Sequence, residues 1–229
     1  MLKIYGVPMS VHTRKVILAA RLKRLPYELI PVVPVIPGNP PPDWRRLSPT
    51  GRIPVLADDD FVLADSAAIC AYLERKHAQT PIYPSGLREH AHALWLEQYA
   101  GGTVFHDVVH PLFHELFVHP KVKNVATDRG RVDHVINTVV PEVFGYLNSI
   151  AGDGFLAGPS LSVADLAVVS NLLVYQYLGF DLERARHPKL AGLFDRVIRV
   201  PEVVEALQAE QPAVQQMGLK SEFLNAVLA

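Results

Sequence analysis

Two dipeptides within residues 47–69 have the residue types that bind the polar ends of a short peptide. Ile53 and Pro54 end a loop and enter a short apolar strand, whereas Asp65 and Ser66 precede an apolar run at helical spacing. We hypothesise that the Ile53–Pro54 bond is cis, which would turn the backbone of Ile53 toward a peptide-like ligand. Free N–H groups at a helix start suit a carboxylate, and the Asp65 carboxylate suits an ammonium group. The stretch therefore predicts a site for a short zwitterionic peptide.

This stretch resembles the glutathione transferases, and the resemblance extends over the whole chain. Residues 51–56 (Gly-Arg-Ile-Pro-Val-Leu) and 65–69 (Asp-Ser-Ala-Ala-Ile) resemble the family's Gly-x-Val/Ile-Pro-x-Leu and Glu/Asp-Ser-x-Ala-Ile. The resemblance implies that Ile53 and Pro54 meet the cysteinyl backbone of glutathione and that Asp65 and Ser66 bind its γ-glutamyl end. Asp65 is one methylene shorter than the usual Glu, which would weaken that contact. The alternative interpretation is a hairpin and a helix cap in an ordinary α/β domain.

Ser10 is the main candidate for the chemical step, because it follows the first predicted strand and begins the first predicted helix. Residues 5–16 (Tyr-Gly-Val-Pro-Met-Ser-Val-His-Thr-Arg-Lys-Val) resemble the serine-type active site of the theta, delta and phi classes. A cysteine thiol has a reference pKa of about 8.5, and a hydroxyl donor and the positive end of a helix both favour its thiolate. Ser10 would therefore donate a hydrogen bond to the sulfur of glutathione. No His/Asp spacing typical of a hydrolase accompanies it.

The assignment of Ser10 leaves alternatives open. Ser10 is an N-cap alone in the simplest alternative, Thr13 supplies the hydroxyl in the second, and Tyr5 ranks third because it lies within the strand. Cys70, the only cysteine, falls among apolar residues of the helix predicted for 66–77, and the chain has no C-x-x-C motif. Disulfide reduction is therefore not the predicted chemistry.

Arg52 precedes Ile53 and is predicted to meet the glycyl carboxylate of glutathione as a charge-assisted partner. The alternative is a solvated loop arginine. Many members of the family also use a basic or amide residue in the loop before the hairpin, but here that loop is filled with proline between residues 31 and 42. The equivalent residue therefore stays unassigned.

Three histidines recur every four residues in the predicted helix that begins at residue 87: His106, His110 and His114. On one face they would bind a metal or line a cavity, but no second ligand cluster is evident and we expect no metal site. In the glutathione transferases the inner face of this helix forms the site for the electrophile. The resemblance therefore implies four walls of that site, with Gln98 as a further contact to glutathione: Thr103, His106, His110 and Phe113. A dimer contact and plain surface histidines are the alternatives.

The elements that must position these residues change in kind along the chain. A strand at 2–5, a helix at 10–22 and a strand at 27–33 form a βαβ unit, in which the apolar helix face contains Val16, Ile17 and Ala20 and excludes Arg14 and Lys15. A hairpin and the 66–77 helix follow. This βαβ-ββα order is that of the thioredoxin-like domain, which the resemblance also implies. We expect this domain to span residues 1–78.

After a linker at 79–85, the strand signal disappears, and we expect an all-helical domain at 86–229. The pattern predicts a helix at 87–117 with a kink or break at Pro111, and a second at 122–150 with a kink at Pro141. Ser162 and Asp165 form a capping box before a buried apolar helix. His187–Pro188 and Val200–Pro201 bracket a shorter predicted helix, and Pro201 begins another.

Composition narrows the class of partner. The chain has 229 residues, is 49% hydrophobic and has a formal net charge of −1 without a basic run, which argues against nucleic acid and anionic membranes as partners. The apolar stretch 161–180 contains Asp, Asn and Gln and is read as a buried helix, not a membrane span. A single cysteine fits a reducing compartment, and we expect a cytoplasmic location.

The predicted function is conjugation of the glutathione thiolate to small hydrophobic electrophiles, as in detoxification, by an α/β plus all-α protein. The resemblance implies a homodimer, glutathione as co-substrate and no other cofactor. Two alternatives use the same fold: a dedicated glutathione-dependent isomerase, dehalogenase or lyase, and a non-catalytic glutathione-binding module.

Overall fold

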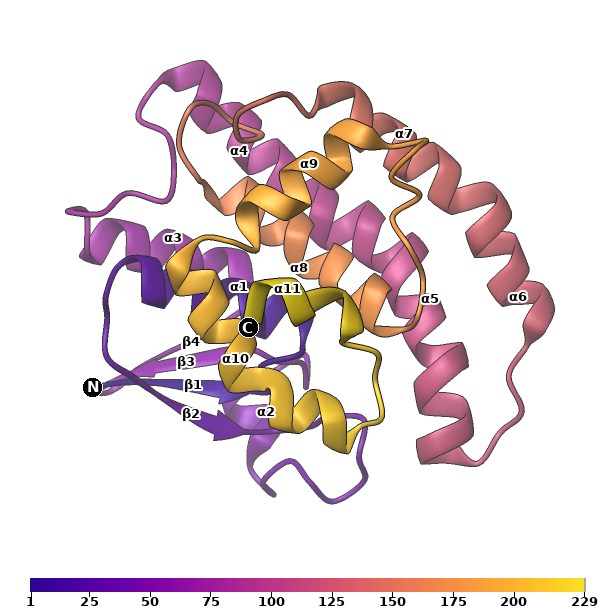
Figure 1. Cartoon of the computed structure of the whole chain (residues 1–229). Helices are drawn as coiled ribbons and strands as arrows, with labels where there is room; N and C mark the ends of the chain where they lie inside the picture. Colours follow the sequence, from indigo (N-terminus) through magenta and orange to yellow (C-terminus); the bar gives the residue numbers. More distant parts are fainter. Residues whose placement is uncertain (229) are drawn as a thin grey trace.

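The computed structural model describes residues 1–228 and places a four-stranded sheet beside a larger set of helices (Figure 1). The sheet has the strand order β2-β1-β3-β4. β1 pairs with β2 in parallel, whereas β1 with β3 and β3 with β4 are antiparallel. The elements of this part are β1 (Leu2–Gly6), α1 (Val11–Leu22), β2 (Tyr27–Pro31), α2 (Trp44–Leu47), β3 (Val55–Asp58), β4 (Phe61–Ala64) and α3 (Ser66–Lys76). The predicted βαβ-ββα order is confirmed.

The two faces of the sheet bury different side chains because successive residues of a strand point to opposite sides. Ile4 and Leu56 are paired across β1 and β3 and belong to the main core, together with residues of α1 and α3. Val55 faces the other way and packs with Trp44 of α2 in a small second cluster. One face of the sheet therefore carries α1, whose first turn includes the predicted active-site serine.

The helical part begins at residue 87. Its elements are α4 (Leu87–Tyr99), η1 (Ala100–Val109), α5 (His110–Phe113), η2 (His114–Lys123), α6 (Arg129–His134), η3 (Val135–Val139), α7 (Val140–Ile150), α8 (Val163–Tyr177), α9 (Pro188–Val197), α10 (Pro201–Gln216), η4 (Glu222–Leu224) and α11 (Asn225–Leu228). Every residue of α8 is buried, as expected for its apolar sequence, and Figure 1 shows α8 in the middle of this part. Asp165 accepts from the backbone N–H of Ser162 at 2.9 Å, which confirms the capping box.

Pro111 does not break the first long helix, so that part of the prediction was wrong; a kink at this position stays a prediction. The helix runs without interruption through α4, η1, α5 and η2, and Pro111 lies in the first turn of α5. The preceding segment η1 is π-helical, and the N–H of His110 bonds to the carbonyl of Phe105 five residues earlier. The wider π-helical turn provides a place for a residue that has no N–H. Gly101 and Phe105 of this segment lie against His12 of α1.

The predicted start of the second long helix at Val122 was also wrong, because Val122 belongs to the last turn of η2. Asn124 ends that helix in the left-handed conformation, with a φ of 53°. The next helix begins at Arg129, where Asp128 caps it by accepting from the N–H of Arg131 at 3.1 Å. Among residues 1–228, no helix combines the length and the apolar character needed to cross a bilayer.

Two buried ion pairs join α1 to the helical part. Arg14 binds Glu210 of α10 through two hydrogen bonds of 3.0 Å, and Lys15 binds Glu97 of α4 at 2.6 Å. The expectation that Arg14 and Lys15 lie away from buried surface was therefore wrong. Periodicity identified the face toward the sheet, but α1 is covered from the other side by α8 and α10 as well.

Candidate active site

The loop before β3 is held by its own side chains and ends at the Ile53–Pro54 bond, which is cis as hypothesised. Ser48 is buried and its hydroxyl donates to the carbonyl of Arg52 at 2.7 Å. The indole of Trp44 donates to the carbonyl of Gly51 at 3.0 Å. Pro54 is buried, whereas Ile53 is half-buried, so the loop presents Ile53 at its surface on a fixed backbone.

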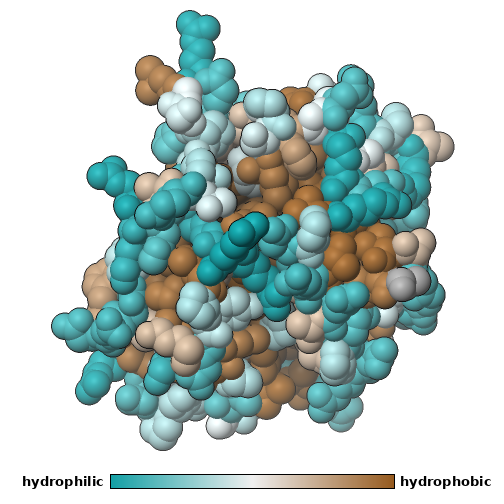
Figure 2. Space-filling model, turned by 60° about the vertical axis from the view of Figure 1, so that its left-hand side comes forward, coloured by the Kyte–Doolittle hydropathy of each residue, from teal (hydrophilic) through white to brown (hydrophobic). Residues whose placement is uncertain are grey.

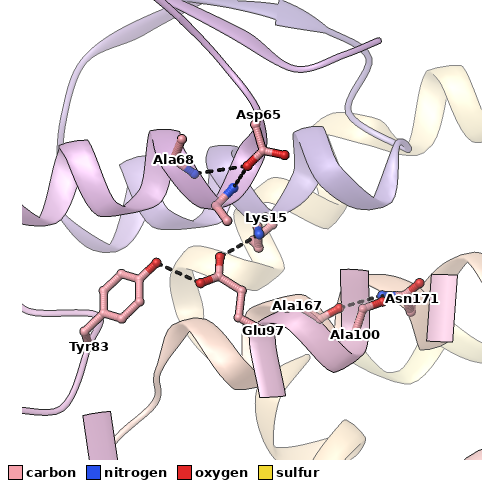
Figure 3. A network of polar contacts seen from close by, with 9 residues as sticks. Lys15, Asp65, Ala68, Tyr83, Glu97, Ala100, Ala167 and Asn171 are labelled. Carbon is pink, nitrogen blue, oxygen red and sulfur yellow. Dashed lines mark hydrogen bonds and ion pairs between the residues drawn. The ribbon is translucent and has the colours of Figure 1, made fainter. Parts of the chain in front are cut away.

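Asp65 and Ser66 form the start of α3, as predicted. Oδ1 of Asp65 accepts from the N–H groups of Ala67 and Ala68 at 2.8 and 3.1 Å (Figure 3). Asp65 is exposed and has a φ of 78°, a conformation that side-chain-bearing residues adopt mainly where the surrounding structure requires it. Because the cap uses one carboxylate oxygen, the other is free to accept from an ammonium group. The Ser66 N–H is at the positive end of the helix.

Ser10 is half-buried and is the N-cap of α1. Its hydroxyl oxygen accepts from the N–H of Thr13 at 3.4 Å. A hydroxyl that accepts through its oxygen still has its own O–H to donate. The capping role and the predicted role toward a thiolate are therefore compatible in one geometry.

Thr13 and Tyr5, the alternatives to Ser10, point elsewhere. Thr13 is fully buried, and its side chain packs so closely against Gly6 that a Cβ on that glycine would lie 2.4 Å from the Thr13 oxygen. A hydroxyl enclosed in this way is turned away from solvent, so the geometry favours Ser10 over Thr13 as the thiol contact. Tyr5 lies near Trp44, with 6.2 Å between ring centroids, on the sheet face away from α1.

The predicted walls of the electrophile site come from one continuous helix. Thr103 and His106 belong to η1, and His110 and Phe113 belong to α5. The rings of His106 and His110 lie 6.1 Å apart, and those of His110 and His114 lie 4.4 Å apart, so these histidines do share one face. Burial and the neighbouring histidines hold the pKa of His110 below its usual value, which favours a neutral ring.

Two features within residues 1–228 concern metal binding and thiol chemistry at Cys70. Among these residues, no group of three or more His, Cys, Asp or Glu side chains is arranged to hold a metal ion. Cys70 is fully buried, and burial raises the pKa of its thiol to about 12. Such a thiol is protonated at neutral pH and inert as a nucleophile.

Sequence reasoning missed two residues at the contact between α1 and η1, His12 and Phe105. Their rings meet edge to face at 4.4 Å, and they bring the first turn of α1 against η1. Burial, followed by the nearby Lys15, lowers the pKa of His12 to about 4. The only sequence signal was the position of His12 two residues after Ser10, and that position does not reveal which distant helix it meets.

The sequence reasoning also missed the polar network beneath the site. Glu97 accepts from Lys15 at 2.6 Å and from the hydroxyl of Tyr83 at 2.9 Å (Figure 3). Asn171 of α8 donates to the carbonyl of Ala100, the first residue of η1, at 3.1 Å. These contacts fix α1 and the π-helical segment relative to one another. Arg52 is exposed, and its side chain has no hydrogen-bonding partner within residues 1–228; Gln98 is likewise exposed.

Comparison with known proteins agrees with this arrangement. Residues 4–81 match the family model "Glutathione S-transferase, N-terminal domain", and residues 106–210 match "Glutathione S-transferase, C-terminal domain". Glutathione S-transferase 3 of Zea mays is 31% identical over 166 residues, which are 72% of this chain and 73% of that protein. Maleylacetoacetate isomerase of Dictyostelium discoideum is 28% identical over 173 residues, 74% of this chain and 75% of that protein.

The structural comparison shows the same fold. FzlA from C. crescentus superposes with a TM-score of 0.83 at 24% identity, over 93% of this chain and 94% of that one. With a maize relative above 30% identity and matches to both halves of the fold, the chain belongs to the glutathione S-transferase family.

Proposed function

We propose that this protein conjugates the glutathione thiolate to small hydrophobic electrophiles, with Ser10 as the group that stabilises the thiolate. The observation that carries the proposal is the position of Ser10: a half-buried hydroxyl, with its O–H free to donate, at the N-terminus of α1. A hydrogen bond to the charged form and the positive end of the helix both lower the pKa of a thiol. Each unit of lowering corresponds to about 1.4 kcal/mol in favour of the thiolate.

We assign the two parts of the chain different tasks. Residues 1–78 bind glutathione, residues 79–85 link the domains and residues 86–229 provide the electrophile site. In the first part the ammonium and carboxylate of the γ-glutamyl group meet Asp65 and the start of α3. The backbone of Ile53, next to Pro54, meets the cysteinyl residue, and the exposed Arg52 meets the glycyl carboxylate.

The electrophile lies against the long helix in this proposal. Half-buried Thr103, His110 and Phe113, together with exposed His106, border the side of that helix. Phe113 stacks on Phe117 at 5.1 Å, so part of this wall is aromatic and apolar. An apolar surface next to a thiolate excludes water from the anion and accepts hydrophobic substrates.

Two measurements test the proposal together. The protein should be retained on immobilised glutathione, and the absorbance of bound thiolate should titrate at a lower pH than that of free glutathione. Retention with a depressed thiol pKa and turnover of a test electrophile is the expected result. Retention without the pKa change would instead identify a binding module, and a protein that is not retained at all would contradict the glutathione site.

A dedicated isomerase is the second candidate, because the Dictyostelium relative is a maleylacetoacetate isomerase. In an isomerase of this kind the thiolate would add to a double bond, the bond would rotate and the thiolate would leave. Glutathione would therefore be regenerated, whereas a conjugating enzyme consumes it. Loss of free thiol during turnover of a test electrophile distinguishes the two.

Replacing Asp65 by Asn should raise the KM for glutathione while leaving kcat nearly unchanged. Asn retains the oxygen that caps α3 at Ala67 and Ala68, but it removes the charge that meets the ammonium group. We expect a KM increase of about tenfold, because the lost charge-assisted contact is exposed to solvent. Steady-state kinetics at varied glutathione measure it. Asp65→Ala is the comparison variant, because it removes the helix cap as well as the charge. An unchanged KM in Asp65→Asn would show that the Asp65 carboxylate does not contact glutathione.

We also propose a cytoplasmic homodimer, as family membership suggests. Several large apolar side chains are exposed, among them Phe61 of β4 and Leu94 and Trp95 of α4. Figure 2 shows hydrophobic residues at the surface between hydrophilic ones on one face. Light scattering should give about twice the chain mass of 25.3 kDa, and cell fractionation tests the location.

A further inference from the structure

His12 occupies the junction between the two domains, where α1 meets η1. It lies in the first turn of α1, two residues after Ser10, and its ring packs edge to face against Phe105 of η1 at 4.4 Å. Gly101 of η1 also lies beside the ring, since a Cβ there would be in ordinary van der Waals contact, 3.9 Å, with Cε1 of His12. His12 therefore lies two residues after the proposed thiolate donor, within electrostatic reach of Asp65 and Arg52, and against the helix that we propose as the electrophile wall.

The nitrogens of the His12 ring have no hydrogen-bonding partner within residues 1–228. The residue is half-buried, and neither nitrogen is among the fully enclosed polar atoms, so both can be reached from outside the protein. Nitrogens that water can reach can exchange that water for a polar group of a ligand. The ring is thus available to a ligand bound where α1 meets η1.

The charge state of His12 follows from its surroundings. Lys15 of its own helix, His106 of η1 and Arg52 of the loop disfavour a protonated ring, and Asp65 at the start of α3 favours one. Burial and Lys15 outweigh Asp65 and hold the pKa at about 4. At neutral pH the ring is uncharged and has one N–H donor and one acceptor nitrogen.

We propose that His12 donates a hydrogen bond to the carbonyl oxygen of α,β-unsaturated carbonyl electrophiles, which makes these compounds the preferred substrates. The inference rests on the proposed function, since it requires a glutathione thiolate near Ser10. The sulfur attacks the β-carbon and forms the C–S bond, while the electron pair of the C=C bond shifts to give an enolate. Negative charge develops on the oxygen that His12 contacts. Water then protonates the α-carbon, replacing the proton that the thiol released.

This role selects among electrophiles by where their charge develops. In an addition to an enone, the oxygen becomes more negative in the transition state, so a fixed donor binds it more strongly there than in the ground state. In a displacement on an alkyl halide, the charge leaves with the halide and no oxygen receives it. Removing the His12 donor should therefore affect the first reaction far more than the second.

Two substrates that share a phenyl group test this proposal: trans-4-phenyl-3-buten-2-one and benzyl chloride. His12→Phe retains an aromatic ring against Phe105 and removes both nitrogens. We expect its kcat for the enone to fall on the order of 100-fold, the loss typical of one oxyanion donor. Its kcat for benzyl chloride should stay within a factor of about three of the wild-type value. His12→Gln and His12→Asn place an amide N–H near one or the other ring nitrogen, and at least one of them should recover enone turnover.

The outcomes separate this inference from the proposed function. Equal losses on both substrates in His12→Phe would show that His12 only packs the domains together, and would overturn the inference. Failure of both amide variants to recover turnover would also count against a donor role. If the wild-type protein conjugates benzyl chloride but not the enone, the proposed substrate class is wrong while the transferase activity stands. A wild-type protein that conjugates neither contradicts the proposed transferase activity itself.

Discussion

Replacing Ser10 by Ala should lower kcat/KM for conjugation on the order of 100-fold, the effect expected when a donor to a reacting anion is removed. The hydroxyl of Ser10 is placed at the N-terminus of α1 with its O–H free, because its oxygen is the atom that accepts from Thr13. Without this donor, the pKa of bound glutathione rises toward its reference value. Less thiolate is then present at neutral pH. Absorbance titration of the bound thiolate and steady-state kinetics measure the two effects.

Three variants separate catalysis by Ser10 from its capping role. Ser10→Thr retains a hydroxyl and should retain most activity. Ser10→Ala loses the hydroxyl and about 1 kcal/mol of stability from the lost cap, whereas Ser10→Gly loses the hydroxyl at a cost of only about 0.3 kcal/mol. We expect equal activity in the Ala and Gly variants despite their different stability. If activity instead follows the melting temperature, Ser10 is a cap alone.

Replacing Glu210 by Gln should have the largest effect on stability. Its carboxylate accepts two hydrogen bonds of 3.0 Å from Arg14 and one of 2.6 Å from the hydroxyl of Tyr177, and the side chains of Arg14 and Glu210 are each 1% exposed. Gln retains the shape but leaves the guanidinium buried without a counter-charge. Breaking one side of a buried pair typically costs about 3 to 5 kcal/mol. In a chain of this length the melting temperature should fall by roughly 10 °C.

The exposed pair of Arg184 and Asp195 is the matched control for Glu210. It has the same two-bond geometry, at 2.7 and 2.9 Å, but its side chains are 50% and 30% exposed. Asp195→Asn should change the free energy of unfolding by less than about 1 kcal/mol. Thermal melts of both variants check the contrast. Similar losses in both would show that burial does not set the value of the Arg14–Glu210 pair.

Local sequence was enough to predict the parts of the site that depend on near neighbours. The helix start at Asp65, the cap at Ser10 and the capping box of Ser162 and Asp165 all appear where expected. Each depends on a side chain and a backbone group within three residues of one another, so the pattern contains the whole interaction. The order of strands and helices was predictable for the same reason.

The helix boundaries were less predictable where local signals compete. Pro111 is a helix breaker by its chemistry, yet the π-helical turn before it accommodates it. Asn124 ends a helix at a position inside the range 122–150, for which periodicity predicted a single continuous helix. Before Pro111 the π-helical segment η1 packs against α8, whereas Asn124 is exposed and ends its helix through its own left-handed conformation.

By itself, the sequence determined the succession of elements, the peptide-binding stretch and the serine at the start of α1. Only the tertiary structure decided which groups from distant parts of the chain meet around α1. It buried Thr13 against Gly6, brought His12 against Phe105, and paired Arg14 with a carboxylate 196 residues away. Such contacts arise where α1 is enclosed between the sheet and the helical domain, and no local pattern specifies them because their partners come from distant parts of the chain.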